Sequence, residues 1–259
     1  MSRVTSIEEL SNLKSKIETE RKFTKQVLIC GGTGCISSGS NEIADKMTEK
    51  VKAAGKENEI RVIKTGCFGF CEKGPIVKML PDNTFYTEVT PEDADRLVET
   101  HLLKEEKIEE LLYVDPVTKN KISDSDHMDF YKKQERVALR NCGVIDPENI
   151  EDYLLYDGYT ALDKVLKMSQ QEVVDIMKDS GLRGRGGGGF PTGLKWLFAL
   201  NNVSDQKYVV CNTDEGDPGA FMDRSILEGD PHSVVEAMAI CGYSIGSNHG
   251  LVYIRAEYP

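Results

Sequence analysis

Apolar positions in the first hundred residues recur with two different periods. Steps of three or four residues predict amphipathic helices over residues 6–22, 41–54 and 91–102. Short apolar runs bounded by turn residues predict four strands, at residues 26–30, 60–64, 76–80 and 85–89. The resulting order, helix, strand, helix, strand, strand, strand, helix, predicts a small α/β domain of roughly 100 residues with a helix-covered sheet.

The pattern changes after this first domain. Residues 106–127 are dense in charge and hold few large apolar side chains, which predicts a linker. Helical periodicity then returns over residues 150–156, 161–167, 170–178 and 232–243, with strands expected at 208–211 and 251–255. We therefore expect an N-terminal helix (1–24), an α/β domain (25–105), a linker (106–127) and a second α/β domain (128–259).

Charge and composition narrow the classes of function. The chain has 259 residues and a net charge of −11 at pH 7, which argues against nucleic acid and anionic membrane surfaces as partners. No stretch approaches the roughly 20 apolar residues of a membrane span. The polar N-terminus shows no signal-peptide pattern. We expect a cytoplasmic protein that binds no nucleic acid and does not insert into a membrane.

Four of the seven cysteines fall into two close pairs. Cys30 and Cys35 are separated by four residues, and Cys67 and Cys71 by three; each pair follows an expected strand in a loop that contains glycine. Two pairs on neighbouring strand ends bring four thiolates together, as an iron–sulfur cluster requires. Glycine lets backbone N–H groups come close to the sulfurs. A structural zinc site with wide cysteine spacing stays open as an alternative.

The other cysteines and the histidines carry no such pattern. Cys142, Cys211 and Cys241 stand alone near apolar residues, so we expect small buried side chains without a ligand role. The four histidines have no spacing partners and are interpreted as surface or hydrogen-bonded residues. An odd cysteine count without a secretion signal also argues against a disulfide framework.

A family resemblance follows from the cysteine spacing. The pattern C-x4-C, about thirty residues, then C-x3-C over residues 25–105 resembles the thioredoxin-like 2Fe–2S ferredoxins, which include the 24-kDa-type subunit of NADH dehydrogenases. The resemblance implies a thioredoxin-like fold and a 2Fe–2S cluster held by Cys30, Cys35, Cys67 and Cys71.

A glycine-rich segment marks the second domain. Six glycines fall within residues 181–189, so the backbone could approach a phosphate or a flat ring. Arg185 and Lys195 supply positive charge, while Phe190 and Trp196 supply stacking surfaces. A helix is expected before this loop, which does not fit a Rossmann site, where a strand precedes the glycines. A flexible loop is the plain alternative.

An acidic segment follows the strand expected at 208–211. Asn212, Asp214, Glu215 and Asp217 lie among glycine and proline. Their oxygens could accept hydrogen bonds from a ribose or from the edge of an isoalloxazine. A calcium loop is a second interpretation, although the spacing is not that of an EF-hand. A solvated acidic turn is the third.

Both segments, with further stretches of residues 128–259, resemble the NADH-binding, FMN-carrying 51-kDa-type flavoprotein subunit of complex I. The resemblance implies FMN and NAD(H) as cofactors. It also implies roles for eleven residues in the pocket, at the flavin or against the dinucleotide: Gly184, Arg185, Gly186, Gly187, Phe190, Lys195, Phe198, Asn212, Asp214, Glu215 and Asp217.

Departures from the respiratory enzymes refine the resemblance. Asp217 stands where those enzymes typically have Glu, and Met222 where they often have Lys. With the fused ferredoxin domain, this resembles the beta subunit of soluble NAD(P)-dependent iron hydrogenases, some of which bifurcate electrons. The implied partners are a catalytic hydrogenase or formate dehydrogenase subunit, a small 2Fe–2S subunit and ferredoxin.

The implied function is hydride exchange between NAD(H) and FMN, with a one-electron relay through iron–sulfur clusters. No single acid–base residue is expected to dominate. An electron-transfer or scaffold module without its own flavin chemistry is the alternative, as is a subunit of an NADH dehydrogenase or formate dehydrogenase complex.

The family pattern continues beyond the strand expected at 251–255. It adds the second half of the flavin site and a four-cysteine motif for a 4Fe–4S cluster. We therefore expect an N-terminal fragment, inactive and weak in FMN retention by itself. The expected fold class is α/β, a thioredoxin-like 2Fe–2S ferredoxin domain followed by the N-terminal half of a complex-I-type flavoprotein domain.

Overall fold

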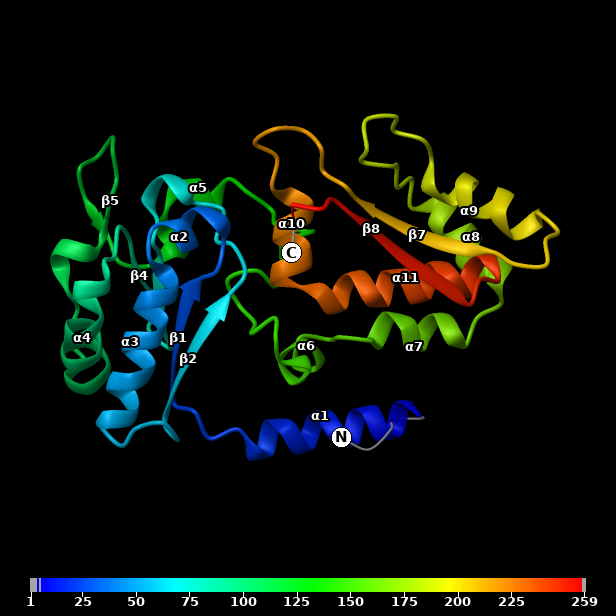
Figure 1. The fold of residues 1–259 in the computed structure, drawn as a ribbon. Helices are drawn as coiled ribbons and strands as arrows, with labels where there is room; N and C mark the ends of the chain where they lie inside the picture. The colour runs from blue at the N-terminus through cyan, green and yellow to red at the C-terminus, as the bar shows by residue number, and fades with distance from the viewer. Residues whose placement is uncertain (1–3, 5, 258–259) are drawn as a thin grey trace. The chain divides into compact units, whose positions relative to one another are not determined.

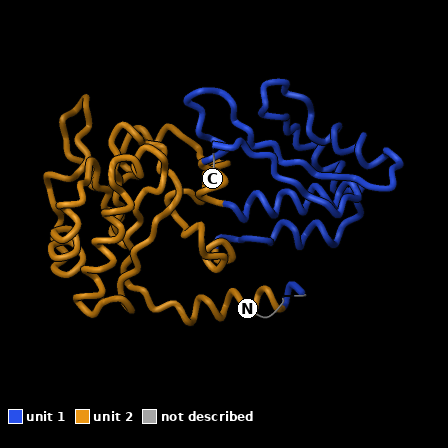
Figure 2. The backbone as a smooth tube through the Cα atoms, viewed as in Figure 1, with its two compact units in different colours: residues 1–8, 156–224, 231–259 blue, residues 9–155, 225–230 orange. Residues whose placement is uncertain are grey.

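A computed structural model describes residues 4 and 6–257, and the chain divides into two compact units (Figure 2). The cysteine unit, orange in Figure 2, consists of Glu9–Leu155 and Ser225–Asp230. The glycine unit, blue, consists mainly of Tyr156–Arg224 and the described residues from Pro231 onward. This division differs from the expected boundary at residue 128, because residues 128–155 belong to the cysteine unit and Ser225–Asp230 return to it from far along the chain.

A four-stranded sheet forms the centre of the cysteine unit, in the order β2-β1-β3-β4. Its strands are β1 (Lys25–Cys30), β2 (Ile60–Thr65), β3 (Val77–Leu80) and β4 (Thr84–Tyr86). The β1 and β2 strands are parallel, with Cys30 opposite Thr65, while β3 runs antiparallel to β1 and β4 antiparallel to β3. The parallel register brings the loops after β1 and β2 to the same edge of the sheet.

Alternate residues of β1 face two separate apolar clusters. Val27 and Ile29 belong to one cluster and Leu28 and Cys30 to the other, and all four side chains are buried. This follows from the two-residue period of a strand that is covered on both faces. Cys30 is therefore held inside the second cluster by the strand itself.

Helices cover the first face of the sheet (Figure 1). They are α3 (Ser40–Ala53), a short helical turn (Pro91–Asp93), α4 (Ala94–Arg96) and a π-helical stretch (Leu97–Leu102). Thr90 and Asp93 form a capping box at the start of this run, where the sequence predicted a helix start. The predicted N-terminal helix is α1 (Ile7–Glu20), and a short helix that was not predicted, α2 (Thr33–Ser37), follows β1.

The segment expected to be a linker, residues 106–127, packs against the sheet instead. It contains a helical turn (Glu109–Leu111) and the antiparallel strands β5 (Tyr113–Val114) and β6 (Lys121–Ile122). Isolated bridges join it to the edge strand β4, and Ile108, Leu112 and Tyr113 are buried, whereas Val114 and Val117 are exposed. High charge density predicted a linker, but a few well-placed apolar side chains are enough to cover a sheet edge.

Residues 128–155 also belong to the cysteine unit. They include α5 (Asp129–Lys132) and α6 (Ile150–Leu155). The buried carboxylate of Asp152 accepts hydrogen bonds from Arg61 at 2.9 and 3.1 Å and also from Arg21. This charge network ties α6 to β2 and explains why the segment stays with the first unit.

The glycine unit combines helices with a parallel strand pair whose second strand is exposed. The helices are α7 (Thr160–Leu166), α8 (Gln170–Asp179), α9 (Thr192–Asn201) and α11 (Pro231–Ile245), and the strands are β7 (Tyr208–Thr213) and β8 (His249–Ile254). A capping box of Ser169 and Glu172 begins α8. Neither α9 nor α10 (Met222–Gly229) was predicted.

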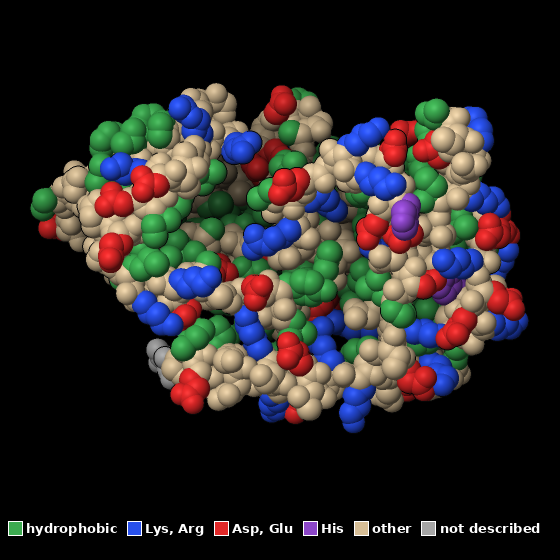
Figure 3. All heavy atoms as spheres, turned by 180° about the vertical axis from the view of Figure 1, so that it is seen from behind, with side chains coloured by type: hydrophobic (Ala, Val, Ile, Leu, Met, Phe, Trp, Pro, Cys, Tyr) green, Lys and Arg blue, Asp and Glu red, His purple; other side chains and the backbone are tan. Residues whose placement is uncertain are grey.

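The described surface mixes charges of both signs. On the face shown in Figure 3, acidic and basic side chains are interspersed. None of the helices formed by residues 4 and 6–257 combines the length and apolar character that a bilayer crossing requires.

Candidate functional site

The four paired cysteines meet at one edge of the sheet. Cys30 is the last residue of β1, Cys35 lies in α2, Cys67 follows β2, and Cys71 begins a helical turn. Cys30 and Cys35 are buried, Cys67 is half-buried and Cys71 is exposed. The site is therefore enclosed on the side of the apolar cluster and open on the side of Cys71.

The four thiols influence one another's ionisation. The neighbouring Cys35 thiol is the main cause that raises the pKa of Cys30 to about 11, and the Cys30 thiol, followed by burial, raises the pKa of Cys67. Four adjoining thiols cannot all ionise without positive charge among them, which is what a metal centre supplies.

Among residues 4 and 6–257, no group of three or more His, Cys, Asp or Glu side chains gathers closely enough to hold a metal ion. The two cysteine pairs thus lie at one edge of the sheet without closing around a single point.

Backbone N–H groups also point at these sulfurs. The amide of Gly69 donates to Cys67 Sγ at 3.2 Å. The backbone N–H groups of Phe68 and Ile76 act in the direction that lowers the pKa values of the Cys30 and Cys35 thiols, against the larger effects that raise the pKa of Cys30. Such bonds favour thiolate over thiol and stabilise an anionic cluster.

The loop after β1 comes close to the sulfurs. A Cβ atom added at Gly32 would lie 2.9 Å from Cys67 Sγ and 3.5 Å from Cys30 Sγ. The site therefore requires a residue without a side chain at this position, as the glycine-bearing loops indicated.

Sequence reasoning missed two side chains of the site. The Tyr131 hydroxyl donates to the carbonyl oxygen of Phe68 at 3.0 Å, and Arg136 donates to the carbonyl oxygen of Cys67 at 2.8 Å. Both residues come from a segment more than sixty positions along the chain, and no local spacing signals them.

Cys142 lies beside the site as a buried thiol. Burial raises its pKa to about 11, and its sulfur contacts the carbonyl oxygen of Ser225 at 3.6 Å. This agrees with the expectation of a small buried side chain. Cys211 and Cys241 are half-buried.

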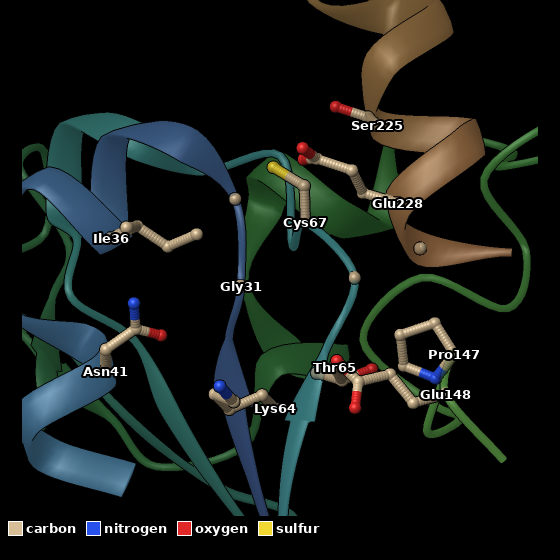
Figure 4. Close-up of a pocket in the computed structure, with 13 residues that line it drawn as sticks. Gly31, Ile36, Asn41, Lys64, Thr65, Cys67, Pro147, Glu148, Ser225 and Glu228 are labelled. Carbon is tan, nitrogen blue, oxygen red and sulfur yellow. The ribbon is translucent and has the colours of Figure 1, made fainter. Parts of the chain in front are cut away.

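A cavity of about 290 Å³ opens beside Cys67 (Figure 4). The turn after β1, the end of β2 and the last turns of α10 line it. Cys67 and Glu228 lie at its upper end in this view, and Lys64 and Glu148 at the lower end. Cys67 is among the residues that line this cavity, and Cys71 is not.

The glycine loop between α8 and α9 is closed at its base. Arg183 pairs with Pro191, the amide of Gly184 donates to the carbonyl oxygen of Phe190 at 2.9 Å, and the Arg183 side chain donates to Gly189 at 3.1 Å. A helix precedes the loop, as predicted, so the arrangement is not a Rossmann turn. The residues with proposed roles here, Gly184, Arg185, Gly186 and Gly187, are exposed on the projecting part of the loop.

Two exposed phenylalanine rings stand beside this loop. Phe190 and Phe198 have ring centroids 6.4 Å apart and are 50% and 62% exposed. Lys195 is exposed one helical turn before Phe198 on α9. The structure thus brings the two rings together, with a cation on the same helix.

The acidic loop lies at the carboxyl end of the parallel strands β7 and β8. Such ends are where ligands bind in open α/β sheets. The Asn212 side chain accepts from the amide of Asp214 at 3.1 Å. The Glu215 carboxylate accepts from the amides of Asp223 and Arg224 at 2.9 and 3.1 Å, at the start of α10.

Through these hydrogen bonds, Asn212 and Glu215 stabilise the local structure. Both were expected to contact a flavin, and here their oxygens hold the loop and the first turn of α10. Asp214 is half-buried and Asp217 is exposed on the same loop. In the view of Figure 1 the glycine loop and this loop both project upward from the glycine unit.

Two family models match the chain. Residues 3–102 match the thioredoxin-like 2Fe-2S ferredoxin family, and residues 177–259 match the Nuo51 FMN-binding domain. The chain carries domains of these two families. The matches confirm the two resemblances drawn from the cysteine spacing and from the glycine and acidic segments.

The chain is also similar to a hydrogenase subunit and to an NADH-quinone oxidoreductase subunit. The chain is 70% identical over 128 residues to the NADP-reducing hydrogenase subunit HndC of Solidesulfovibrio fructosivorans, covering 49% of this chain and 26% of that protein. It is 51% identical over 111 residues to an NADH-quinone oxidoreductase subunit of Aquifex aeolicus, covering 43% and 26%. The chain thus spans about a quarter of the length of these relatives.

A solved structure also matches the ferredoxin domain. The thioredoxin-like 2Fe-2S ferredoxin of Aquifex aeolicus is 33% identical, and the match covers 34% of this chain and 95% of that one, with a TM-score of 0.32.

Proposed function

We propose that the chain is part of an electron-transfer oxidoreductase subunit in which Cys30, Cys35, Cys67 and Cys71 hold a 2Fe–2S cluster. The observation that carries this proposal is the convergence of the two cysteine pairs at the ends of the parallel strands β1 and β2, where the N–H of Gly69 donates to Cys67 Sγ at 3.2 Å. A Cβ atom at Gly32 would lie within 3.5 Å of both Cys67 Sγ and Cys30 Sγ, so sulfurs of both pairs adjoin the same loop. Four converging thiolates are the ligand set of a 2Fe–2S cluster.

The glycine unit would contribute one side of an FMN and NAD(H) site. Its glycine loop is open to a phosphate, and Arg185 and Lys195 would offset phosphate charge. Phe190 and Phe198 present exposed ring faces for stacking. Asp214 and Asp217 remain the acidic groups best placed to accept hydrogen bonds from a ligand. When bound, FMN would supply the exchange between two-electron hydride chemistry and one-electron transfer.

The proposed partners are the remaining subunits of a soluble enzyme complex in the cytoplasm. A hydrogenase catalytic subunit and a small 2Fe–2S subunit are favoured because the 70% identical relative is named as a hydrogenase subunit. Ferredoxin is a further proposed partner, with electron bifurcation as the associated activity. A formate dehydrogenase or NADH dehydrogenase complex would use the same domains.

A second candidate is an electron-transfer or scaffold module without its own flavin chemistry. The hydrogen bonds of Asn212 and Glu215 favour it, because both groups are already engaged within the protein. NADH-dependent dye reduction by the complete subunit separates the two candidates. Activity that falls when Lys195 is replaced by Ala supports the first, and dye reduction absent from the intact subunit supports the second.

The cluster proposal is tested by metal analysis. Iron, acid-labile sulfide and zinc are measured per chain after anaerobic purification. We expect iron and sulfide at about two each. Cys35→Ser should lower both, while Cys211→Ser, a matched control in the glycine unit, should leave them unchanged. Zinc at about one per chain without sulfide would replace the proposal with a structural zinc site.

A further inference from the structure

Two side chains from a segment that neither family model matches reach the cysteine site. Tyr131 and Arg136 lie between the matched regions, which end at residue 102 and begin at residue 177. The Tyr131 hydroxyl donates to the carbonyl oxygen of Phe68, and the Arg136 guanidinium to that of Cys67. These are the oxygens of two consecutive peptide groups in the loop between Cys67 and Cys71.

The opposite ends of the same peptide groups face sulfur. In a planar trans peptide the C=O and N–H bonds point in opposite directions. The peptide whose oxygen Arg136 binds carries the N–H of Phe68, which acts on the Cys30 thiol in the direction that lowers its pKa. The peptide whose oxygen Tyr131 binds carries the N–H of Gly69, which donates to Cys67 Sγ at 3.2 Å.

We propose that Tyr131 and Arg136 are positioning residues that aim these two N–H groups at the cluster sulfurs and thereby raise the reduction potential of the cluster. The inference rests on the proposed 2Fe–2S site and names the residues that regulate it. Reduction adds one electron to the cluster and makes it more negative, without forming or breaking a bond. N–H···S bonds and a nearby cation stabilise that added charge.

Each of the two side chains acts in its own way. Tyr131 is neutral and can act only through the peptide that it holds. Arg136 holds a peptide and also brings a positive charge, and its second donor reaches the carbonyl oxygen of Cys142 at 3.3 Å. A purely structural brace would affect stability and iron content but not the potential of the clusters that remain.

The test measures the midpoint potential of the full chain by a dithionite titration followed in visible absorption. Tyr131→Phe removes one oxygen, Arg136→Gln removes the charge but keeps an amide donor, and Arg136→Lys keeps the charge. We expect Arg136→Gln to make reduction on the order of tenfold less favourable, a shift of about 59 mV to lower potential for one electron. Tyr131→Phe should make reduction severalfold less favourable, which also lowers the potential. Arg136→Lys should recover part of the potential lost in Arg136→Gln.

A matched control uses the same segment. Arg140 is exposed four residues further on, so Arg140→Gln removes the same charge from a solvated position and should change the potential little. In the reduced protein, pulsed EPR of exchangeable deuterons should report weaker N–H···S coupling in Tyr131→Phe than in the wild type.

Each outcome is decisive. Unchanged potentials in Tyr131→Phe and Arg136→Gln overturn the inference, as does an equal shift in Arg140→Gln. If Arg136→Gln loses its iron, Tyr131→Phe decides alone, and an unchanged potential there overturns the inference. A wild-type chain without iron and sulfide defeats the proposed function itself, and the inference with it, before any variant is compared.

Discussion

Replacing Gly32 by Ala should weaken the retention of the cluster while leaving the apoprotein folded. The backbone at Gly32 has φ −68° and ψ 149°, which alanine adopts freely, so the backbone does not oppose the change. The obstacle is space, because the new Cβ would lie 2.9 Å from Cys67 Sγ and 3.1 Å from Cys67 Cβ. In the apoprotein the half-buried Cys67 side chain can rotate away. A bound cluster fixes that sulfur and forces the overlap.

The size of the effect follows from the overlap. Comfortable contacts between heavy atoms begin at about 3.5 Å, so the Cβ is about 0.6 Å too close. Overpacking of this kind costs about 1–3 kcal/mol. Because each 1.4 kcal/mol is a factor of ten, the cluster should be held roughly 5- to 140-fold less tightly.

Gly34 provides the matched control. An alanine Cβ there would lie 3.7 and 3.8 Å from Cys71 Cβ and Sγ, which is ordinary contact. Gly34 lies within α2, where alanine favours the helix by about 0.5–1 kcal/mol. Both variants add one methyl group to the same loop, so only the distance to sulfur separates them.

The assay is the rate at which iron is lost to a chelator, with circular dichroism of the apoprotein as the measure of folding. Gly32→Ala should lose iron faster than the wild type, and Gly34→Ala should not. Retention by Gly32→Ala equal to that of Gly34→Ala would show that the sulfurs do not lie where the structure places them.

Two further predictions concern the cysteine unit. Asp152→Asn should lower the free energy of unfolding by about 1.5–3 kcal/mol, because it weakens the charged hydrogen bonds that the half-buried Arg61 and Arg21 donate to this buried carboxylate, while Arg61 keeps its pair with Asp146. Urea denaturation measures this, and a loss below about 1 kcal/mol contradicts it. Burial lowers the pKa of His101 below its usual 6.5, so the unfolded chain takes up that proton first as the pH falls. The unfolding free energy of the wild type should therefore decrease below about pH 6.5 more steeply than that of His101→Gln, and parallel pH curves would refute this origin.

The cysteine site could be predicted because its parts are local. Each pair follows one strand, and a parallel register between β1 and β2 is enough to bring the pairs together. The expected strands and most helices are present for the same reason, since their periodicity is visible within a few turns.

What the sequence could not reveal depends on distant contacts. Tyr131 and Arg136 bind backbone oxygens of a loop that is far away along the chain, and backbone acceptors leave no mark in side-chain spacing. Glu215 caps α10 from eight residues away, beyond the reach of the usual capping box. Residues 106–127 were expected to be a linker because of their charge density. The sequence does not show that β4 is an edge strand with unpaired backbone groups, to which this segment binds.

The return of Ser225–Asp230 to the cysteine unit has a consequence for synthesis on the ribosome. Ser225 contacts the Cys142 sulfur, and Asp230 accepts a hydrogen bond from Asn141 at 2.8 Å. Translation must therefore pass through residues 156–224 before the first unit receives its last piece. Until then Cys142 lacks its cover from Ser225, and a nascent chain halted near residue 155 would expose this thiol to oxidants. A recombinant chain that ends between residues 155 and 225 would leave Cys142 without the same cover.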